Sequence, residues 1–275
     1  MPGALFSLLA PGIGVTTCVL REEALKLPPV IGQFIHLPGS PFSNLTFLTP
    51  AEAMDSLCAR MLLEYMLKLS GQRGALRMLA EVDADSLVFD ALRKLGFATY
   101  TRQRIWQITG MAPNPGGDLT WRPAGPQDEL AIRILYNNLV PGLVQQVEPF
   151  SSRRPKGMVY YGQGDLLAYV ELKYGHRGIW AQPFVHPGAE NMPELFIDMV
   201  SKIPGRRTRP VYLCVRSYQA WLEAAVEDLG AESGPRQAVM ARHLAVQQKT
   251  RAAVAMPALE GGQPEITAPV RVETK

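Results

Sequence analysis

The chain has little cysteine and histidine, and this shortage excludes two classes of protein. Its three cysteines, Cys18, Cys58 and Cys214, lie far apart in a chain of 275 residues. So odd and sparse a set indicates reduced thiols and not a disulfide framework. The four histidines are scattered as well, and no group of residues has the spacing of a metal site. We therefore expect a cytoplasmic protein without a bound metal.

The chain also has little net charge and no long hydrophobic run. A formal charge of +3 is too small to indicate a nucleic-acid partner, and the basic runs at 151–157 and 203–209 lie beside proline and glycine, as solvated loops do. The longest apolar run, 57–69, carries charged residues and is too short to span a bilayer. The apolar N-terminus lacks the basic start of a signal peptide. We expect neither a nucleic-acid nor a membrane partner.

What the sequence does contain is a helix, a glycine stop and a long strand in direct succession. The stretch "ALRKLGFATYTRQRIW" (91–106) starts as an amphipathic run and continues as alternating, aromatic-rich sequence. Asp85 is placed to cap this helix and Gly96 to end it. A divergent copy, "AAVEDLGAESGPRQAVM", follows at 224–240.

The two copies are related by one constant offset. A shift of 134 residues matches six identical pairs: Leu79 with Leu213, Ala91 with Ala225, Leu95 with Leu229, Gly96 with Gly230, Arg102 with Arg236 and Gln103 with Gln237. Further upstream "FLTP" matches "FVHP" at an offset of 137, so the drift is only three residues. A constant offset across strand, helix and strand indicates a duplicated unit.

The same coarse order of elements is predicted in both halves from hydrophobic periodicity and turn residues. In the first half we expect strands at 14–22, 29–37 and 44–50, a helix at 51–70, a strand at 75–82, a helix at 86–95 and a strand at 97–108. In the second half we expect a strand at 119–124, a helix at 128–139, a hairpin over 157–175, a strand at 178–187, a helix at 194–203, a strand at 210–217, a helix at 219–229 and a strand at 236–244.

Breaker-rich stretches set the predicted domain boundaries. We expect an N-terminal domain at 1–110, shortened at its start, a linker at 111–118, a C-terminal domain at 119–246 and a flexible tail at 247–275. Strand–helix–strand order implies parallel pairing, whereas the hairpin is antiparallel. Each domain is therefore an α/β unit with a mixed sheet.

The order of elements, and "ALRKLGF" in particular, resembles the GNAT acyltransferase superfamily, whose members often end in "LYEKLGF" followed by an aromatic-rich strand. The resemblance covers roughly residues 14–108 and 119–245. It implies an α/β fold of two tandem GNAT-like domains, each a mixed, twisted sheet with flanking helices.

The resemblance also implies a co-substrate, acetyl-CoA or another acyl-CoA. In GNAT proteins the pantetheine arm lies between two splayed central strands, and the diphosphate lies at the start of the helix that follows the first of them. In the first copy this region comprises Phe47, Leu48, Ala53, Met54, Asp55, Ser56, Leu57 and Cys58. In the second copy it comprises Phe184, Val185, Gly188 and Ala189.

The phosphate-binding motif of the family, Arg/Gln-x-x-Gly-x-Gly/Ala, is degenerate in both copies. Its positions hold Ala53, Ser56 and Cys58 in the first copy. In the second copy they hold Glu190, Pro193 and Leu195, which place a carboxylate and bulk where an anion would bind. The alternative is an ordinary strand–helix connection, and the second copy is the weaker candidate.

Catalytic residues are few. At the position before "EKLGF" where many GNAT proteins have a tyrosine, this chain has Leu92 in the first copy and Val226 in the second. Glu81, which interrupts an apolar strand, is the candidate general base; the alternative is a surface carboxylate.

The region between the first helix and second strand shapes the acceptor site in GNAT proteins. Here it supplies Tyr136, Asn138, Gln145, Gln146 and Glu148, and Trp180 and Gln182 alternate with apolar residues nearby. These residues form either an acceptor site or a contact surface between domains. The sequence thus predicts acetyl transfer to a small-molecule or protein amine; the alternative is a catalytically inactive GNAT-like protein that binds CoA, a metabolite or a partner.

Overall fold

The computed structural model describes residues 14–21, 29–110, 121–150 and 155–244. We call 14–108 the N-terminal copy and 121–243 the C-terminal copy. The N-terminal copy contains β1 (Val15–Leu20), β2 (Val30–Ile35), β3 (Phe42–Thr49), α2 (Leu57–Gln72), β4 (Arg77–Asp83), α3 (Leu87–Lys94) and β5 (Ala98–Ile108). The C-terminal copy contains β6 (Arg122–Pro123), α4 (Glu129–Leu139), α5 (Gly142–Val147), β7 (Gly157–Gly162), β8 (Asp165–Tyr174), β9 (Ile179–Val185), α6 (Met192–Lys202), β10 (Val211–Arg216), α7 (Leu222–Glu227) and β11 (Glu232–His243).

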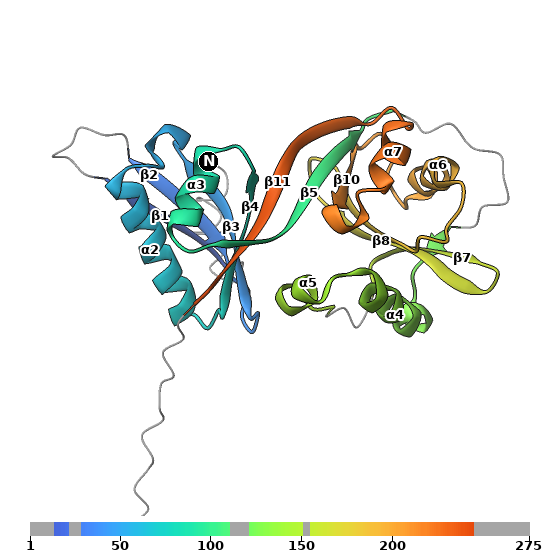
Figure 1. Cartoon of the computed structure of the whole chain (residues 1–275), viewed down its shortest axis with the longest axis horizontal. Coiled ribbons are helices and arrows are strands. Elements are labelled where there is room, and N and C mark those ends of the chain that lie inside the picture. The colour runs from blue at the N-terminus through green and yellow to red at the C-terminus, as the bar shows by residue number, and fades with distance from the viewer. Residues whose placement is uncertain (1–13, 22–28, 111–120, 151–154, 245–275) are drawn as a thin grey trace, which may run out of the picture.

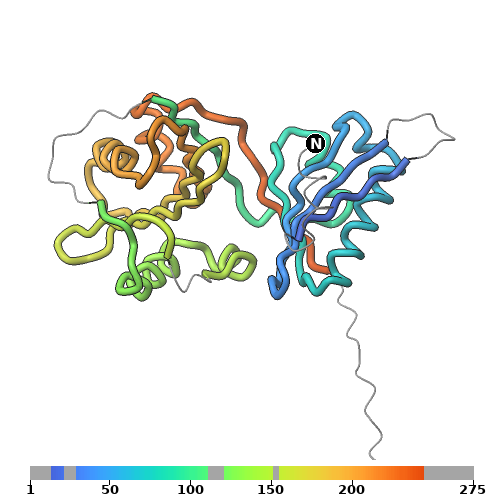
Figure 2. The backbone as a smooth tube through the Cα atoms, turned by 180° about the vertical axis from the view of Figure 1, so that it is seen from behind, coloured from blue at the N-terminus to red at the C-terminus, as the bar shows by residue number. Residues whose placement is uncertain are grey.

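The strands of both copies form one continuous mixed sheet, and its order shows that the copies exchange their last strands. In the described residues the order is β1-β2-β3-β4-β11-β5-β10-β9-β8-β7-β6. The last strand of the C-terminal copy, β11, therefore pairs with β4, and β5 pairs with β10. Figures 1 and 2 show β5 and β11 running side by side between the two halves.

The register between the exchanged strands reveals a local twofold axis. Gln103 of β5 pairs with Gln237 of β11, and these are the residues that the offset of 134 matches. On either side of this pair Arg104 pairs with Arg236 and Arg102 with Ala238, so the two strands are related by a twofold rotation about the Gln103–Gln237 pair. The single chain thus reproduces the isologous contact of a symmetric dimer.

Helices cover the two copies unequally. In the N-terminal copy α2 and α3 pack on one face of the sheet, with Leu62, Leu63 and Leu92 in their core. In the C-terminal copy α6 and α7 cover one face, and α4 and α5 lie over the other (Figure 1). The described part of the N-terminal copy has no counterpart of α4 and α5. Instead Val147 of α5 packs against Leu79 of β4, so the C-terminal copy covers part of that bare face.

Local chemistry explains where some predicted boundaries were wrong. The helix expected from Ala51 begins at Leu57, because a 3-10 turn occupies Ala51–Ala53 and Ser56 caps the helix by accepting the Ala59 N–H at 3.1 Å. The expected cap Asp85 is replaced by its neighbour Ser86, whose hydroxyl accepts the Phe89 N–H at 3.2 Å. The predicted stop at Gly96 is confirmed by its φ of +77°.

Other expectations differ in extent or lie outside the described residues. The strand expected at 119–124 is the two-residue β6, and α5 forms within a stretch for which no helix was predicted. The predicted linker at 111–118 and tail at 247–275 lie outside the described residues. None of the helices in the described ranges is long and apolar enough to cross a membrane.

Candidate functional site

In each copy the two central parallel strands separate partway along their length. Strands β3 and β4 pair only as far as Leu45 and Ala80, although β4 continues to Asp83. Strands β9 and β10 pair only as far as Ala181 and Leu213. Beyond these points each pair leaves backbone groups on its inner edges without ladder partners. Each copy therefore has the splayed pair of strands that the resemblance implied.

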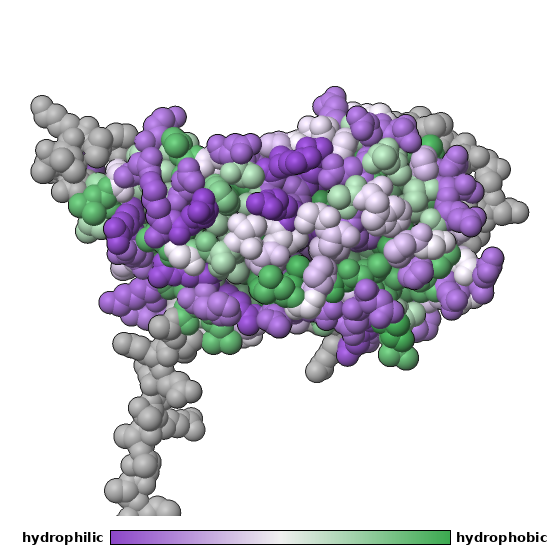
Figure 3. All heavy atoms as spheres, viewed as in Figure 1, coloured by the Kyte–Doolittle hydropathy of each residue, from purple (hydrophilic) through white to green (hydrophobic). Residues whose placement is uncertain are grey.

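A central cavity of about 460 Å³ lies between the copies and is lined by both. Glu81 and Leu79 enter it from the N-terminal copy, and Glu148, Glu171 and Arg216 from the C-terminal copy. In Figure 3 the surface between the halves combines strongly hydrophilic residues above with pale and hydrophobic residues below. The cavity therefore offers charged groups together with apolar walls.

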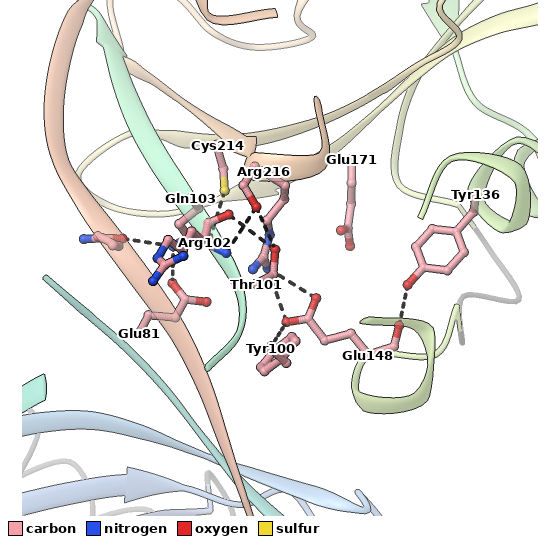
Figure 4. A network of polar contacts seen from close by, with 12 residues as sticks. Glu81, Tyr100, Thr101, Arg102, Gln103, Tyr136, Glu148, Glu171, Cys214 and Arg216 are labelled. Atoms are coloured by element: carbon pink, nitrogen blue, oxygen red, sulfur yellow. Dashed lines mark hydrogen bonds and ion pairs between the residues drawn. The ribbon is translucent and has the colours of Figure 1, made fainter. Parts of the chain in front are cut away.

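Glu81 is held in this cavity by a residue of the exchanged strand. The Gln103 side chain donates from Nε2 to Glu81 Oε2 at 2.9 Å and to Gln237 Oε1 at 2.9 Å. Its Oε1 accepts from Cys214 Sγ at 3.3 Å. Figure 4 shows Gln103 between Glu81 and Cys214. Because Gln103 belongs to β5, the orientation of Glu81 depends on the strand exchange.

A second cluster is built around Glu148. Arg216, only 4% exposed, places Nη2 at 3.2 Å from both oxygens of Glu148. The Tyr100 hydroxyl donates to the same carboxylate, and the Tyr136 hydroxyl donates to the Glu148 carbonyl oxygen. Figure 4 also shows Glu171 extending from β8 toward Glu148. The cluster joins residues of β5, β10 and the end of α5.

Burial and charge fix the protonation of this cluster. Burial, the largest single effect, lowers the pKa of Arg216, but the combined effect of the neighbouring groups, Glu148 first and Glu81 among them, outweighs it and the pKa is raised. Burial, assisted by the charge of Glu148, raises the pKa of Tyr100 and brings that of Tyr136 to about 12. At neutral pH the arginine is charged and both tyrosines keep their protons.

The structure brings together four of the predicted acceptor residues and separates the other three. Tyr136, Glu148, Trp180 and Gln182 line the central cavity. Asn138 is exposed on α4 and lies outside it. Gln145 donates to the carbonyls of Asn137 and Val140 at 3.1 and 2.7 Å, closing the end of α4. The carbonyl of Gln146 accepts from Arg77 at 2.6 Å, which is a contact between the two copies.

The predicted cofactor region of the N-terminal copy borders a separate cavity of about 320 Å³. It lies between the start of α2 and the end of α3 and is lined by Met54, Asp55, Ser56 and Leu57 of the predicted set, together with Arg60 and Lys94. Lys94 pairs with Asp55 at 2.6 Å and Arg60 with Glu64 at 3.1 Å.

The remaining predicted cofactor residues of this copy do not line that cavity. Ala53 and Cys58 are buried in the core, and Phe47 and Leu48 lie on the part of β3 that has left β4.

In the corresponding turn of the C-terminal copy, backbone N–H groups are already hydrogen-bonded within the turn. The His186 ring accepts the Gly188 N–H at 3.0 Å, and the His186 carbonyl accepts the Ala189 N–H at 2.9 Å. The Gln219 side chain donates to the Val185 carbonyl at 3.1 Å, and Ala189 is buried in the core. Phe184 alone of the four predicted residues lines the central cavity. These contacts leave the turn with little capacity to bind an anion.

The sequence did not predict several residues of the central cavity, among them Arg216, Glu171 and Tyr218. Arg216 carried a usable signal, because it ends the apolar strand "VYLCV" as Glu81 interrupts its own. Its partner Glu148 lies 68 residues away in the chain, and no local pattern joins the two.

Comparison with solved structures decides the fold. A protein of unknown function from Staphylococcus epidermidis aligns with a TM-score of 0.54 at 12% identity over 78% of this chain and 91% of its own. A GCN5-related N-acetyltransferase from Kribbella flavida aligns with a TM-score of 0.52 at 11% identity over 87% and 93%. One from Sphaerobacter thermophilus gives 0.51 at 13% identity over 84% and 76%. The chain has the GNAT fold. No protein-family model and no curated protein matches it.

The GNAT fold relates the position of each cavity to the central strands of the N-terminal copy and to the helix that joins them. Each copy supplies the mixed sheet with flanking helices that the resemblance implied, and the two follow each other in tandem. In GNAT terms β3 and β4 are the splayed central strands of the N-terminal copy, and α2 is the helix after the first of them. The 320 Å³ cavity adjoins the start of that helix. The central cavity lies on the opposite face of the sheet, where Leu79 and Glu81 point.

Proposed function

We propose that the chain is an acyl-CoA-dependent N-acyltransferase in which the N-terminal copy binds acyl-CoA and the central cavity binds the acceptor amine. The observation that carries the proposal is the position of Glu81. It lies just beyond the point where β4 leaves β3, and its side chain enters the central cavity. An acyl group held between these strands would face the carboxylate.

The residues of the N-terminal copy fit an acyl-CoA. The start of α2 presents N–H groups and the positive end of the helix dipole to the 320 Å³ cavity. Arg60 and Lys94 line the same cavity, and each belongs to an exposed ion pair, with Glu64 and Asp55, from which a phosphate group would draw it. Small residues, Ser56 and Cys58, stand at the glycine positions of the motif, and Ser56 lines the cavity. When bound, acyl-CoA would supply the activated acyl group.

In this proposal Glu81 is the general base. It takes a proton from the ammonium group of the acceptor, so that the free amine can attack the thioester carbonyl. Gln103 fixes the carboxylate by its hydrogen bond to Oε2 at 2.9 Å. Leu92, which stands where many family members have tyrosine, is fully buried and cannot donate a proton. After attack the nitrogen releases its second proton to solvent, and the departing sulfur takes a proton from solvent.

The C-terminal copy has a different role in this proposal. Its equivalent turn is closed by His186 and Gln219, which favours a copy that shapes the acceptor site without binding CoA. Calorimetric titration with acetyl-CoA and with free CoA tests this assignment. We expect one site per chain, whereas two sites would contradict the closed turn. No binding would leave the alternative, a GNAT-like protein without catalysis.

The chemical step is tested by Glu81→Gln in an assay of CoA release with a panel of primary amines. Loss of a general base costs a factor of about 10² to 10⁴ in turnover. We expect a loss of this size with acetyl-CoA affinity within about twofold of the original protein. Asp85→Asn is the matched control, because Asp85 is an exposed carboxylate just after the same strand and lies outside the central cavity. Unaltered turnover in Glu81→Gln would remove Glu81 from the mechanism.

A further inference from the structure

The central cavity carries one more negative than positive side chain. Its carboxylates are Glu81, Glu148 and Glu171, and its cations are Lys173 and Arg216. Arg216 pairs with Glu148 at 3.2 Å and Lys173 with Glu171 at 3.5 Å. Among the described residues Glu81 has no ion-pair partner and is held only by the Gln103 amide. The uncompensated negative charge therefore lies at Glu81.

The rest of the cavity wall is mainly aromatic. Seven aromatic residues line it: Phe42, Tyr136, Phe150, Tyr169, Trp180, Phe184 and Tyr218. The rings of Tyr136 and Phe184 lie 5.4 Å apart, and those of Tyr169 and Phe184 are stacked at 6.0 Å. The Tyr136 hydroxyl donates to the Glu148 carbonyl, and the Tyr169 hydroxyl donates to the Lys156 carbonyl. The hydroxyl protons of these two tyrosines are therefore already engaged in hydrogen bonds within the protein, and the rings present mainly apolar surface to a ligand.

A carboxylate without a cation, set among aromatic walls, selects for one kind of ligand. The carboxylate attracts an ammonium group, and aromatic faces favour both cations and flat apolar groups. A dication would leave excess positive charge, and an anion would meet the net negative charge of the wall. The volume of about 460 Å³ suits a small molecule with one ring.

We infer that the ligand of the central cavity is a monocationic primary amine with an aromatic body, whose ammonium group pairs with Glu81. This inference rests on the proposed function, in which the same amine is the acyl acceptor. The aromatic body lies against the face of β9 that presents Trp180 and Phe184. Arg216 keeps Glu148 paired, so that Glu81 is the carboxylate free to bind the amine.

Calorimetry without acyl-CoA tests the inference directly. The probes are 2-phenylethylamine, its neutral analogue 2-phenylethanol, the anion 3-phenylpropionate, and butylamine, which lacks the ring. We expect 2-phenylethylamine to bind at least tenfold more tightly than each of the other three. Glu81→Gln should weaken the binding of 2-phenylethylamine at least tenfold and leave 2-phenylethanol unchanged. Asp85→Asn, which removes an exposed carboxylate just after the same strand and outside the cavity, should bind like the original protein.

The outcomes separate the inference from the transferase proposal. Preference for 3-phenylpropionate, or equal binding of all four probes, would overturn the inference. So would Glu81→Gln binding 2-phenylethylamine as well as the original protein while its thermal unfolding shows an intact fold. If 2-phenylethylamine binds through Glu81 but no amide forms with acetyl-CoA, the inferred amine site is supported and the proposed acyltransferase activity is refuted. If other amines are acylated and 2-phenylethylamine does not bind, only the inference falls.

Discussion

Two serines in equivalent local positions allow the proposed CoA site at the start of α2 to be tested with an internal control. Ser56 caps α2 and Ser86 caps α3, each by accepting a backbone N–H three residues later, at 3.1 and 3.2 Å. Ser56 lines the cavity of about 320 Å³, whereas Ser86 lies at the other end of α3 from the residues that line it. The variants Ser56→Glu and Ser86→Glu therefore change the same kind of helix cap, but only Ser56→Glu changes the lining of the proposed CoA site.

The expected magnitudes follow from the geometry. Loss of either cap costs about 1 kcal/mol of stability, offset in part by the attraction between a carboxylate and the start of a helix. Both variants should therefore unfold within a few degrees of the original protein. A diphosphate over the first turn of α2 would lie roughly 5 Å from the new carboxylate of Ser56→Glu. Repulsion of two phosphate charges at partly exposed positions amounts to about 2 kcal/mol, or roughly thirtyfold in affinity.

Calorimetric titration with CoA, paired with thermal unfolding, measures both quantities. We expect Ser56→Glu to bind CoA roughly thirtyfold more weakly and Ser86→Glu to bind it within about twofold of the original protein. Raising the salt concentration should reduce the difference, because screening weakens repulsion between exposed charges. If both variants bind CoA equally well, the cavity at the start of α2 is not the phosphate site. Leu57→Trp, at an exposed position of the same cavity, repeats the test by filling it.

Three further predictions concern stability, reactivity and assembly. The Arg122 guanidinium holds the pKa of buried Asp128 at about 2, so the stability this carboxylate contributes is present above pH 4 and is lost as the pH falls through about 2. Asp128→Asn should therefore cost roughly 2 kcal/mol in denaturant unfolding at pH 7 and little at pH 2. Burial raises the pKa of Cys214 to about 12, so its thiol should resist iodoacetamide at pH 8 until the protein unfolds. Residues 1–110 alone should dimerise in size-exclusion chromatography, with β5 of each molecule beside β4 of the other; a stable monomer would contradict this.

The sequence predicted the elements of the fold, the parallel pairs β3–β4 and β9–β10 and the antiparallel hairpin, but not the pairing between the two copies. Strand and helix positions follow from local periodicity, and Gly96 and Gly230, with φ of +77° and +70°, end helices as their positions indicated. The exchange of β5 and β11 has no local signal. Both strands are long and carry the same matched pair, Gln103 and Gln237, so each could complete either copy. Which sheet each strand joins is decided by packing between residues that are distant in the sequence.

The candidate site was predicted unevenly for a similar reason. Glu81 was found because a carboxylate within an apolar strand is a local anomaly, and Trp180 and Gln182 because alternation places them on one face of a strand. Gln145 and Gln146 were misplaced because α5 forms where no helix was expected, and a helical turn sends their side chains away from the cavity. Arg216 and Glu148 acquire their role only through tertiary contact.

The strand exchange is what makes one cavity out of two copies. Glu81 belongs to the N-terminal copy, but the amide that holds it comes from β5, which is inserted between β11 and β10 of the other copy. Tyr100, on the same strand, donates to Glu148 of the C-terminal copy. Separate, unexchanged domains would break both contacts and would leave the bare face of the N-terminal sheet without α5. On this face α5 of the C-terminal copy therefore stands where the described part of the N-terminal copy has no helix, and a site of this composition requires residues of both copies.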